Sequence, residues 1–244
     1  MSSPLPTCPT LEEKTILIWA TDVERWMASW EWVTAPLDEW EQTRLHAMRD
    51  IPTRKTFGVS RGLLRRLLGH YANCAPEAIS FAYGDEGKPS VAGPVEAKTL
   101  RFNVSHSGGT LLIALARSID VGVDLERIRP RKGLDALARR YFSQAEQIAM
   151  KSAPEAERPR VFFSIWCRKE ACLKAIGRGV TYPLATLDFA EPGSVTITLC
   201  EGTDTTIHVS DVKAPFPSCA VAVASMEESC TIRTIQTSSQ IPLP

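Results

Sequence analysis

The segment RVFFSIWCRKEACLKAI, roughly residues 160–176, most restricts how this chain can fold. It is long enough for a helix of several turns, and Gly177 and Gly179 follow it as stop signals. Its first half is strongly apolar, so the helix must bury most of its surface against other elements. The apolar residues in question are Phe162, Phe163, Ile165 and Trp166.

Alternating segments on both sides of this helix predict the strands that would cover it. ILIWA, ISFAY, LRFNVSH and TLLIALA precede the helix, and LDFA, SVTITLC, TTIHVS and CAVAVAS follow it, around Gly and Pro turns. A second helix is predicted over residues 53–71, and two short helices over 133–150 are expected to meet at Ser143, whose spacing to Glu146 is that of a capping box. The chain is therefore predicted to be α+β, with antiparallel sheets packed against helices.

Composition narrows the class of protein further. The 244 residues carry 28 basic and 28 acidic side chains, so the net charge of zero offers no general attraction to nucleic acid or to an anionic membrane. Seven cysteines without a C-x-x-C pair argue against a zinc site or a disulfide framework. The N-terminus lacks the order of a signal peptide, and no apolar run is long enough to span a membrane. We expect a cytoplasmic protein with neither nucleic acid nor membrane as its partner.

Two acids end an apolar run in VGVDLE. Asp124 and Glu126 lie two residues apart, so in an extended strand their carboxylates project from the same face while Val123 and Leu125 point the other way. Carboxylates so close repel each other unless a cation lies between them. The strand is therefore predicted to contribute half of a cation site.

The long helix offers the other half. Glu170 and Lys174 are four residues apart and share a helix face, an arrangement that usually means an ordinary surface ion pair. The apolar residues around them make a partly buried carboxylate the better interpretation here. Asp124, Glu126 and Glu170 together would form an oxygen-only site suited to a hard cation such as Mg²⁺, which also bridges phosphate oxygens.

Two features keep alternative interpretations open. In TRKTFGVSRGLLRRLLGHY, the basic residues flank an apolar stripe and are either solvated or available to a phosphate. They are Arg54, Lys55, Arg61 and Arg65. Five of the six tryptophans fall within the first forty residues, where they either pack in the core or form a docking surface.

Two short motifs resemble catalytic or nucleotide-binding loops only weakly. FNVSHSGG places His106 between two serines, but it lacks the G-x-S-x-G elbow of a serine hydrolase, and a structural histidine is the alternative. GDEGKPS contains Gly87 and Lys88 but is too short for a Walker A loop, and Pro89 removes a backbone donor that such a loop would use.

Taken in order, FNVSHSG, VGVDLE and WCRKEACLKAIGRG resemble the motifs of the Sfp-type 4′-phosphopantetheinyl transferases. The resemblance covers residues 102–180 closely, and more loosely GKP at 87–89 and the predicted helix at 53–71. It implies transfer of the 4′-phosphopantetheine arm of coenzyme A to a serine of an apo acyl or peptidyl carrier protein, with Mg²⁺ as cofactor and adenosine 3′,5′-bisphosphate as the second product. The carrier proteins of this family are usually acidic.

The resemblance also implies roles for individual residues. Asp124, Glu126 and Glu170 would be the Mg²⁺ ligands, with Glu170 as the candidate base and Lys174 near the pyrophosphate. The remaining coenzyme A contacts would come from Ser105 and His106 at the phosphates, Lys88 and Pro89 at the nucleotide, and Arg54, Lys55 and Arg61 at the 3′-phosphate.

The family fold implies two similar α/β halves related by a pseudo-twofold axis. We expect an N-terminal half over residues 1–118, which would bind the nucleotide side of coenzyme A. A C-terminal half over 119–230 would carry the acids, and residues 231–244 would form a flexible tail. Two halves in one chain imply a monomer. The alternative function is a non-catalytic module of the same fold that binds coenzyme A or a carrier protein.

Overall fold

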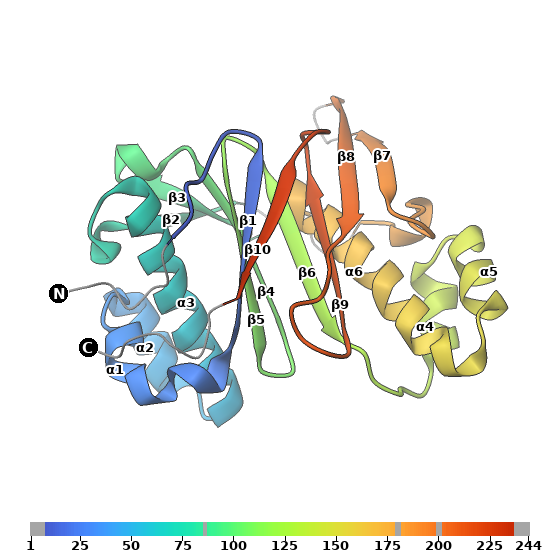
Figure 1. Ribbon diagram of the computed structural model, residues 1–244, viewed down its shortest axis with the longest axis horizontal. Helices are drawn as coiled ribbons and strands as arrows, with labels where there is room; N and C mark the ends of the chain where they lie inside the picture. Colours follow the sequence, from blue (N-terminus) through green and yellow to red (C-terminus); the bar gives the residue numbers. More distant parts are fainter. Residues whose placement is uncertain (1–7, 85–86, 179–181, 199–201, 237–244) are drawn as a thin grey trace.

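The computed structural model describes residues 8–84, 87–178, 182–198 and 202–236. Its strands and helices are shown in Figure 1. The strands are β1 (Thr15–Asp22), β2 (Ser80–Tyr83), β3 (Pro89–Gly93), β4 (Leu100–Ser107), β5 (Thr110–Arg117), β6 (Val121–Arg127), β7 (Gly193–Thr198), β8 (Asp204–Asp211), β9 (Cys219–Ser225) and β10 (Thr231–Gln236). The α-helices are α1 (Trp30–Thr34), α2 (Glu39–Ala47), α3 (Ile51–Ala72), α4 (Leu134–Tyr141), α5 (Gln144–Ser152) and α6 (Arg158–Ile176). Short 3-10 turns occupy Val23–Ser29, Pro76–Ala78, Val95–Ala97, Glu155–Glu157 and Leu184–Thr186.

Two four-stranded sheets form the middle of the molecule. The first has the order β10-β1-β5-β4 and the second the order β6-β9-β8-β7, while β2 and β3 form a separate hairpin. The sheets lie between α1 to α3 on one side and α4 to α6 on the other (Figure 1). This arrangement confirms the predicted α+β class, with one exception: β10 pairs with β1 in parallel, whereas the other pairings are antiparallel.

Successive side chains of each strand point to opposite faces of its sheet, so each sheet packs against a different layer on each face. On β1, Leu17 and Trp19 pack with α3, whereas Ile16 and Ile18 face the second sheet. On β6, Val123 and Leu125 belong to the same core between the sheets. A third core packs α6 onto β8 and β9, so each sheet is covered on its outer face by one long helix.

The predicted helices form close to the expected positions. The helix expected over 53–71 is α3, and the capping box is confirmed because Glu146 N donates to Ser143 Oγ at 3.1 Å and Ser143 N donates to Glu146 Oε2 at 2.7 Å. The long helix is α6, and Gly177 ends it in the left-handed conformation that favours glycine. Four expected features lie wholly or partly outside the described residues. They are the stop signal Gly179, residues 85–86 of the expected turn, the end of the expected strand at 199–200, and residues 237–244 of the expected tail.

Two expectations about local structure were wrong. LDFA at residues 187–190 is not a strand; Leu187 and Phe189 are buried, but the segment passes under α6 as a loop. Residues 231–236, expected in a flexible tail, form β10, whose pairing with β1 covers an edge that would otherwise be open. The strand is partly exposed, so its short-range hydrophobic pattern is weak. The division of the chain at 118/119 stays a prediction.

Candidate active site

A glycine allows β6 and α6 to approach closely enough to form the site. A Cβ built on Gly122 would lie 2.0 Å from the carbonyl oxygen of Ala171, so only glycine fits where the strand crosses the helix. Gly122, Asp124 and Glu126 share one face of β6 by strand alternation, and Glu170 and Lys174 lie on the neighbouring turns of α6. The structure thus brings together the predicted acids of the strand and the helix.

Lys174 reaches from α6 to the first strand acid. Its Nζ donates to Asp124 Oδ1 at 2.7 Å and to the carbonyl oxygen of Val123 at 3.1 Å. Asp124 is buried and Lys174 is partly buried. The ammonium group therefore balances one carboxylate of the cluster.

Two carboxylate oxygens of the cluster are buried and have no hydrogen-bond partner within the described part of the chain: Asp124 Oδ2 and Glu170 Oε1. Burial raises the pKa of Glu170, and the nearby charge of Asp124 raises it further. Burial also raises the pKa of Glu126, although a hydrogen bond from Ser107 opposes the rise. The three acids thus share one ammonium group as their nearby positive charge, and their repulsion would be relieved by a cation.

The donor chemistry fits Mg²⁺. The cluster offers only oxygen ligands, which a hard cation prefers, and two of its oxygens are open. Among the described residues, however, no three His, Cys, Asp or Glu side chains are already arranged to hold a metal. Asp124, Glu126 and Glu170 would hold the ion through the oxygens that Ser105, Ser107 and Lys174 do not bind.

Ser105 and His106 come from opposite faces of β4. The Ser105 hydroxyl is buried and donates to Asp124 Oδ1 at 2.9 Å. The His106 side chain is exposed, and partial desolvation and the charge of Lys174 lower the pKa of its imidazole. The structure thus places Ser105 behind the acids and His106 at the surface beside Lys174.

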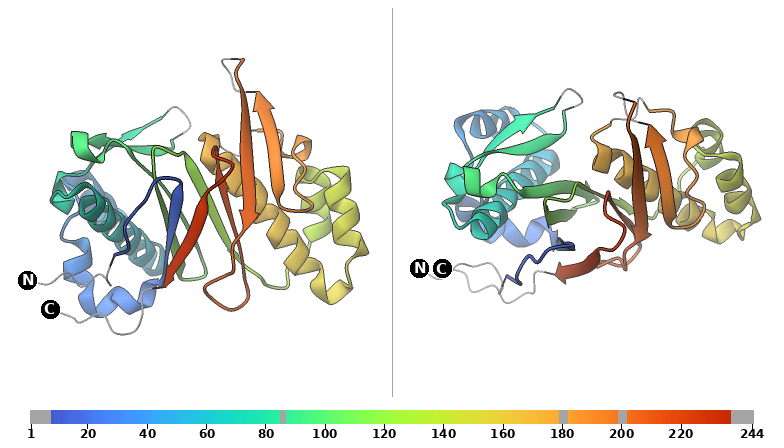
Figure 2. Two further views of the ribbon diagram at one scale, coloured as in Figure 1. Left: turned by 45° about the horizontal axis from the view of Figure 1, so that its top comes forward. Right: turned by 90° about the horizontal axis from the view of Figure 1, so that it is seen from above.

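Lys88 and Pro89 lie at the start of β3, in the hairpin that extends toward the C-terminal end of α6 (Figure 2). Lys88 Nζ donates to the carbonyl oxygen of Ala175 at 2.7 Å, and burial lowers the pKa of this lysine. A cavity of about 440 Å³ opens beside the hairpin and borders both residues. Its other charged lining residues are Lys98, Arg101 and Asp120.

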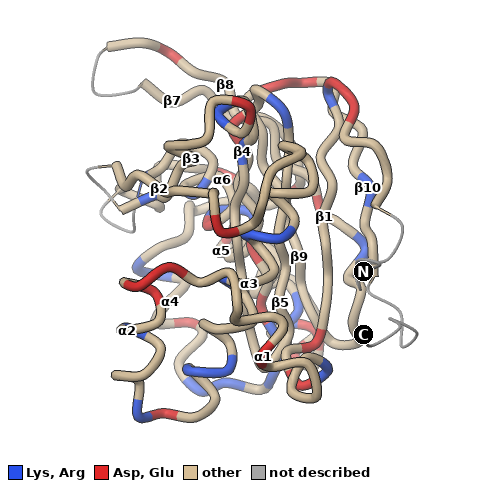
Figure 3. The backbone as a smooth tube through the Cα atoms, turned by 90° about the vertical axis from the view of Figure 1, so that its left-hand side faces the viewer, with Lys and Arg blue, Asp and Glu red and all other residues tan. Residues whose placement is uncertain are grey.

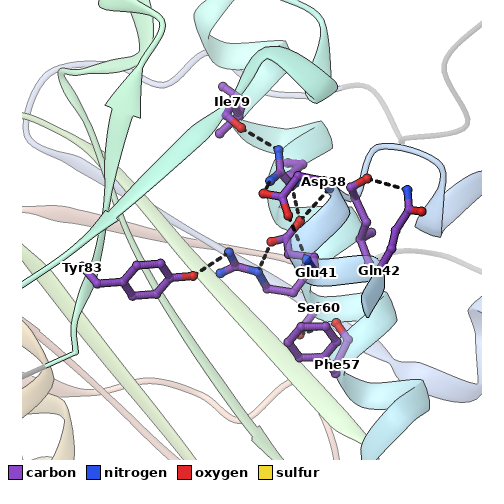
Figure 4. Close-up of polar contacts among 10 residues, drawn as sticks. Asp38, Glu41, Gln42, Phe57, Ser60, Ile79 and Tyr83 are labelled. Atoms are coloured by element: carbon purple, nitrogen blue, oxygen red, sulfur yellow. Dashed lines mark hydrogen bonds and ion pairs between the residues drawn. The ribbon is translucent and has the colours of Figure 1, made fainter. Parts of the chain in front are cut away.

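The predicted 3′-phosphate residues lie on α3 and differ in their surroundings. Arg61 Nε binds Glu41, and its Nη2 donates to Tyr83 Oη at 3.2 Å. Figure 4 shows Glu41 and Tyr83, the two partners of this side chain. Lys55 Nζ binds Glu24 Oε1 at 2.8 Å, whereas Arg54 is exposed. Basic and acidic residues alternate over this side of the molecule (Figure 3).

One expectation about α3 was wrong. Arg65 was placed on a basic edge of the helix, but it is fully buried, and its Nε donates to Glu41 Oε2 at 2.6 Å. Its Nη2 also binds Asp38. Arg65 therefore joins α3 to α2 by binding Asp38 and Glu41, the two acids of the capping box of α2. Helix periodicity alone does not indicate this contact.

Sequence reasoning missed several polar residues near the site. Lys98 and Arg101 had no motif around them, although both border the cavity beside Lys88. Asn103 and Ser107 stood within the FNVSHSG motif, where their spacing from Ser105 was an available signal. Residues two apart in a strand share a face, so this spacing alone places the three side chains on one face of β4.

Comparison with known proteins identifies the family of this chain. A family model described as "4′-phosphopantetheinyl transferase superfamily" matches residues 120–225, and one described as "4′-phosphopantetheinyl transferase, N-terminal" matches residues 21–118. The 4′-phosphopantetheinyl transferase HetI of Nostoc sp. is 32% identical over 177 residues, which cover 72% of this chain and 75% of HetI. The 4′-phosphopantetheinyl transferase psf-1 of Bacillus pumilus is 32% identical over 178 residues, covering 72% of this chain and 68% of psf-1.

A solved structure shows a more limited likeness. It is a holo-(acyl-carrier-protein) synthase from Bacillus anthracis in complex with coenzyme A, with 21% identity and a TM-score of 0.32. The match covers 43% of this chain and 93% of that one. The two family models span β4 and β5 of the first sheet and all four strands of the second, and their ranges include the acids of β6 and α6. This chain therefore belongs to the 4′-phosphopantetheinyl transferase family.

Proposed function

We propose that this protein transfers the 4′-phosphopantetheine group of coenzyme A to a serine hydroxyl of an apo acyl or peptidyl carrier protein, with Mg²⁺ as cofactor. Adenosine 3′,5′-bisphosphate would be the second product. The observation that carries the proposal is the cluster of Asp124, Glu126 and Glu170 beside Lys174, with two buried carboxylate oxygens open. Family membership gives the reaction class, and this cluster supplies the charges that the reaction needs.

Asp124, Glu126 and Glu170 would hold the Mg²⁺. When bound, the ion would neutralise charge on the pyrophosphate and so favour attack at its β-phosphorus. Lys174 would release Asp124 and bind phosphate oxygens through its ammonium group. His106 is exposed beside Lys174 and could donate a hydrogen bond to the same phosphates.

Glu170 is the proposed base. A serine hydroxyl is a weak nucleophile, so its proton must leave as the oxygen attacks phosphorus. Glu170 Oε1 is buried and has no hydrogen-bond partner among the described residues, so this carboxylate is not committed to another protein group. Glu170 would accept the proton at the carboxylate oxygen that does not bind Mg²⁺, while the bond from the β-phosphorus to the bridging oxygen breaks and adenosine 3′,5′-bisphosphate leaves.

The cavity beside the β2–β3 hairpin is the proposed site for the nucleotide end of coenzyme A. Lys88, Lys98 and Arg101 give it three cations against Asp120, and Pro89 and Phe102 supply apolar surface. Arg54 is the better placed of the α3 residues to reach a 3′-phosphate, because Arg61 and Lys55 already bind acids. These contacts would place the pyrophosphate toward Lys174.

The carrier protein would dock next to Glu126. The chain leaves β6 through a strongly basic segment, and this segment and α4 expose six cations. They are Arg127, Arg129, Arg131, Lys132, Arg139 and Arg140. An acidic carrier protein would be attracted to this surface, and exposed Ile148 on α5 offers an apolar contact nearby. We further propose that the enzyme acts as a monomer.

The test is the intact mass of a purified apo carrier protein after incubation with this protein, coenzyme A and Mg²⁺. We expect the mass to increase by one phosphopantetheine arm, and we expect a chelator or the Asp124→Ala variant to prevent the increase. Fatty-acid, polyketide and peptide carrier proteins would be tested in parallel. Coenzyme A binding without any mass increase would indicate the non-catalytic binding module instead. A mass increase that persists with chelator would contradict the Mg²⁺ requirement.

A further inference from the structure

The two sheets meet at β4 and β6, where side chains replace the usual backbone ladder. Asn103 Oδ1 accepts a hydrogen bond from Val123 N at 2.9 Å, Ser105 Oγ from Leu125 N at 3.1 Å, and Ser107 Oγ from Arg127 N at 3.2 Å. The steps are two residues on each strand, so the three bonds follow the strand period. We call Asn103, Ser105 and Ser107 the junction residues.

These bonds satisfy amides that the second sheet leaves open. β6 pairs with β9 along one edge, and the amides of Val123, Leu125 and Arg127 point from the other edge toward β4. A buried amide without a partner is costly, so the bonds at the buried residues Val123 and Leu125 fix the position of β6 along β4. The bond at Arg127 is exposed and continues the same register.

Two of the three junction residues also touch the acids. Ser105 Oγ donates to Asp124 Oδ1 at 2.9 Å, and Ser107 Oγ donates to Glu126 Oε2 at 2.8 Å. A hydroxyl has one proton and two lone pairs, so accepting from the β6 amide leaves its proton for the carboxylate. Asn103 has no corresponding acid to bind, because the β6 residue on this face beside Val123 is Gly122.

The hydroxyls select which carboxylate oxygen stays open. Ser105 and Lys174 both bind Oδ1 of Asp124, and Oδ2 is the buried oxygen without a partner. Ser107 likewise binds Oε2 of Glu126 and leaves Oε1 for another contact. Each bond fixes the rotation of a carboxylate, which decides where its second oxygen points.

We propose that Ser107 is a positioning residue for Glu126, and Ser105 for Asp124, so that the contact between the two sheets also sets the geometry of the cation site. Asn103 provides the same contact between the strands without acting on the site. This inference rests on the proposed function, because it assumes that the acids hold a divalent cation. In this inference the Ser105 hydroxyl binds Asp124, whereas the family resemblance implies that it contacts a phosphate of coenzyme A.

The experiment compares Ser107→Ala with Asn103→Ala, because each removes one bond from the junction and only the first releases an acid. Mn²⁺ binding would be titrated by electron paramagnetic resonance on full-length protein with coenzyme A, after subtraction of the signal change caused by coenzyme A alone. Thermal unfolding and carrier-protein loading would be measured on the same samples. Ser107→Thr keeps a hydroxyl and serves as the conservative rescue.

We expect Ser107→Ala to weaken Mn²⁺ binding about tenfold, the size of effect seen when a ligand loses its hydrogen-bonded support. Asn103→Ala should lower the melting temperature to a similar degree but leave Mn²⁺ affinity within about twofold of wild type, and Ser107→Thr should recover most of the lost affinity. In carrier loading, Ser107→Ala should reduce kcat and leave the KM for coenzyme A nearly unchanged.

Three results would overturn the inference. If Ser107→Ala bound Mn²⁺ as wild type does while wild type loads the carrier protein, Ser107 would be structural and the proposed function would stand. If wild type bound no Mn²⁺ and loaded no carrier protein, the proposed function would fail and the inference with it. Equal loss of affinity in Asn103→Ala and Ser107→Ala would also contradict the inference, because only the contact between the strands would then matter.

Discussion

Lys174 Nζ lies 2.7 Å from Asp124 Oδ1, so a helix cation and a strand acid form an ion pair across the packing of α6 on β6. The sequence placed Lys174 four residues after Glu170, and the usual interpretation would pair those two. The tertiary structure pairs Lys174 with Asp124 instead, and Glu170 Oε1 remains without a hydrogen-bond partner. In the proposed function, the same lysine would hold Asp124 before substrate binds and contact phosphate afterwards.

Replacement of Lys174 tests this change of partner. We expect Lys174→Ala to lower kcat/KM for coenzyme A by about 10²–10³-fold, because one preorganised charge at the phosphates is lost. Lys174→Arg should recover only part of the rate, since its planar guanidinium group differs in shape from an ammonium. Steady-state kinetics with a carrier protein would measure both variants. A Lys174→Ala enzyme with wild-type kcat/KM would show that the lysine serves only the fold.

Gly122→Ala should disrupt the contact between β6 and α6. The new methyl group would lie 2.0 Å from the carbonyl oxygen of Ala171 and 2.5 Å from the amide nitrogen of Ala175, so the helix must move. We expect the free energy of unfolding to fall by about 1–3 kcal/mol or more, as overpacking does elsewhere.

The matched control for this change is Gly193→Ala at the start of β7, where a Cβ would meet no atom within 4 Å. Denaturation by urea would compare the two variants. A Gly122→Ala protein as stable as Gly193→Ala would contradict the close packing described here.

Glu146→Gln should destabilise the second half of the chain. Glu146 and Lys169 are fully buried, their charged atoms lie 2.8 Å apart, and Lys169 Nζ also donates to the carbonyl oxygens of Leu184 and Leu187. Removing one charge leaves the other buried without its partner, which costs about 3–5 kcal/mol. Thermal or urea unfolding would measure the loss.

The exposed pair of Glu157 and Arg160 gives the control, because an exposed pair contributes about 0–1 kcal/mol. Glu157→Gln should therefore unfold almost as wild type does. Similar losses in Glu146→Gln and Glu157→Gln would mean that the buried pair is not essential to the packing of α5 on α6.

Replacing Arg54 and replacing Arg61 should affect different properties of the protein. The first change should weaken coenzyme A binding, and the second should lower the melting temperature. Arg61 binds Glu41 and stacks over the ring of Phe81 with its Cζ 4.3 Å from the centroid, so Arg61→Ala should lower the melting temperature. Arg54 is exposed, and Arg54→Ala should leave the melting temperature near that of wild type while weakening coenzyme A binding.

Isothermal titration with coenzyme A and with dephospho-coenzyme A would show whether the 3′-phosphate is involved. We expect Arg54→Ala to weaken binding of the first ligand about tenfold and the second far less, because a charged hydrogen bond to phosphate is lost only from the first. Equal weakening for both ligands would place Arg54 away from the 3′-phosphate.

Local sequence patterns determined most of the secondary structure. The apolar periodicity of α3 and α6 and the capping box at Ser143 appear as the pattern indicates. The alternation in VGVDLE placed Val123 and Leu125 in a core and Asp124 and Glu126 on the opposite face. These features depend on neighbours a few residues away, so a single sequence contains the information.

Only the tertiary structure decided which distant groups meet. β10 pairs with β1, although more than two hundred residues separate them, and Arg65 is buried because Asp38 and Glu41 lie on the neighbouring helix. The junction residues of β4 meet the amides of β6 because two sheets pack together, and this packing also brings Lys174 to Asp124. Side-chain types and their periodicity set the elements of this protein, whereas partners far apart in the chain depend on how those elements pack, which no local pattern encodes.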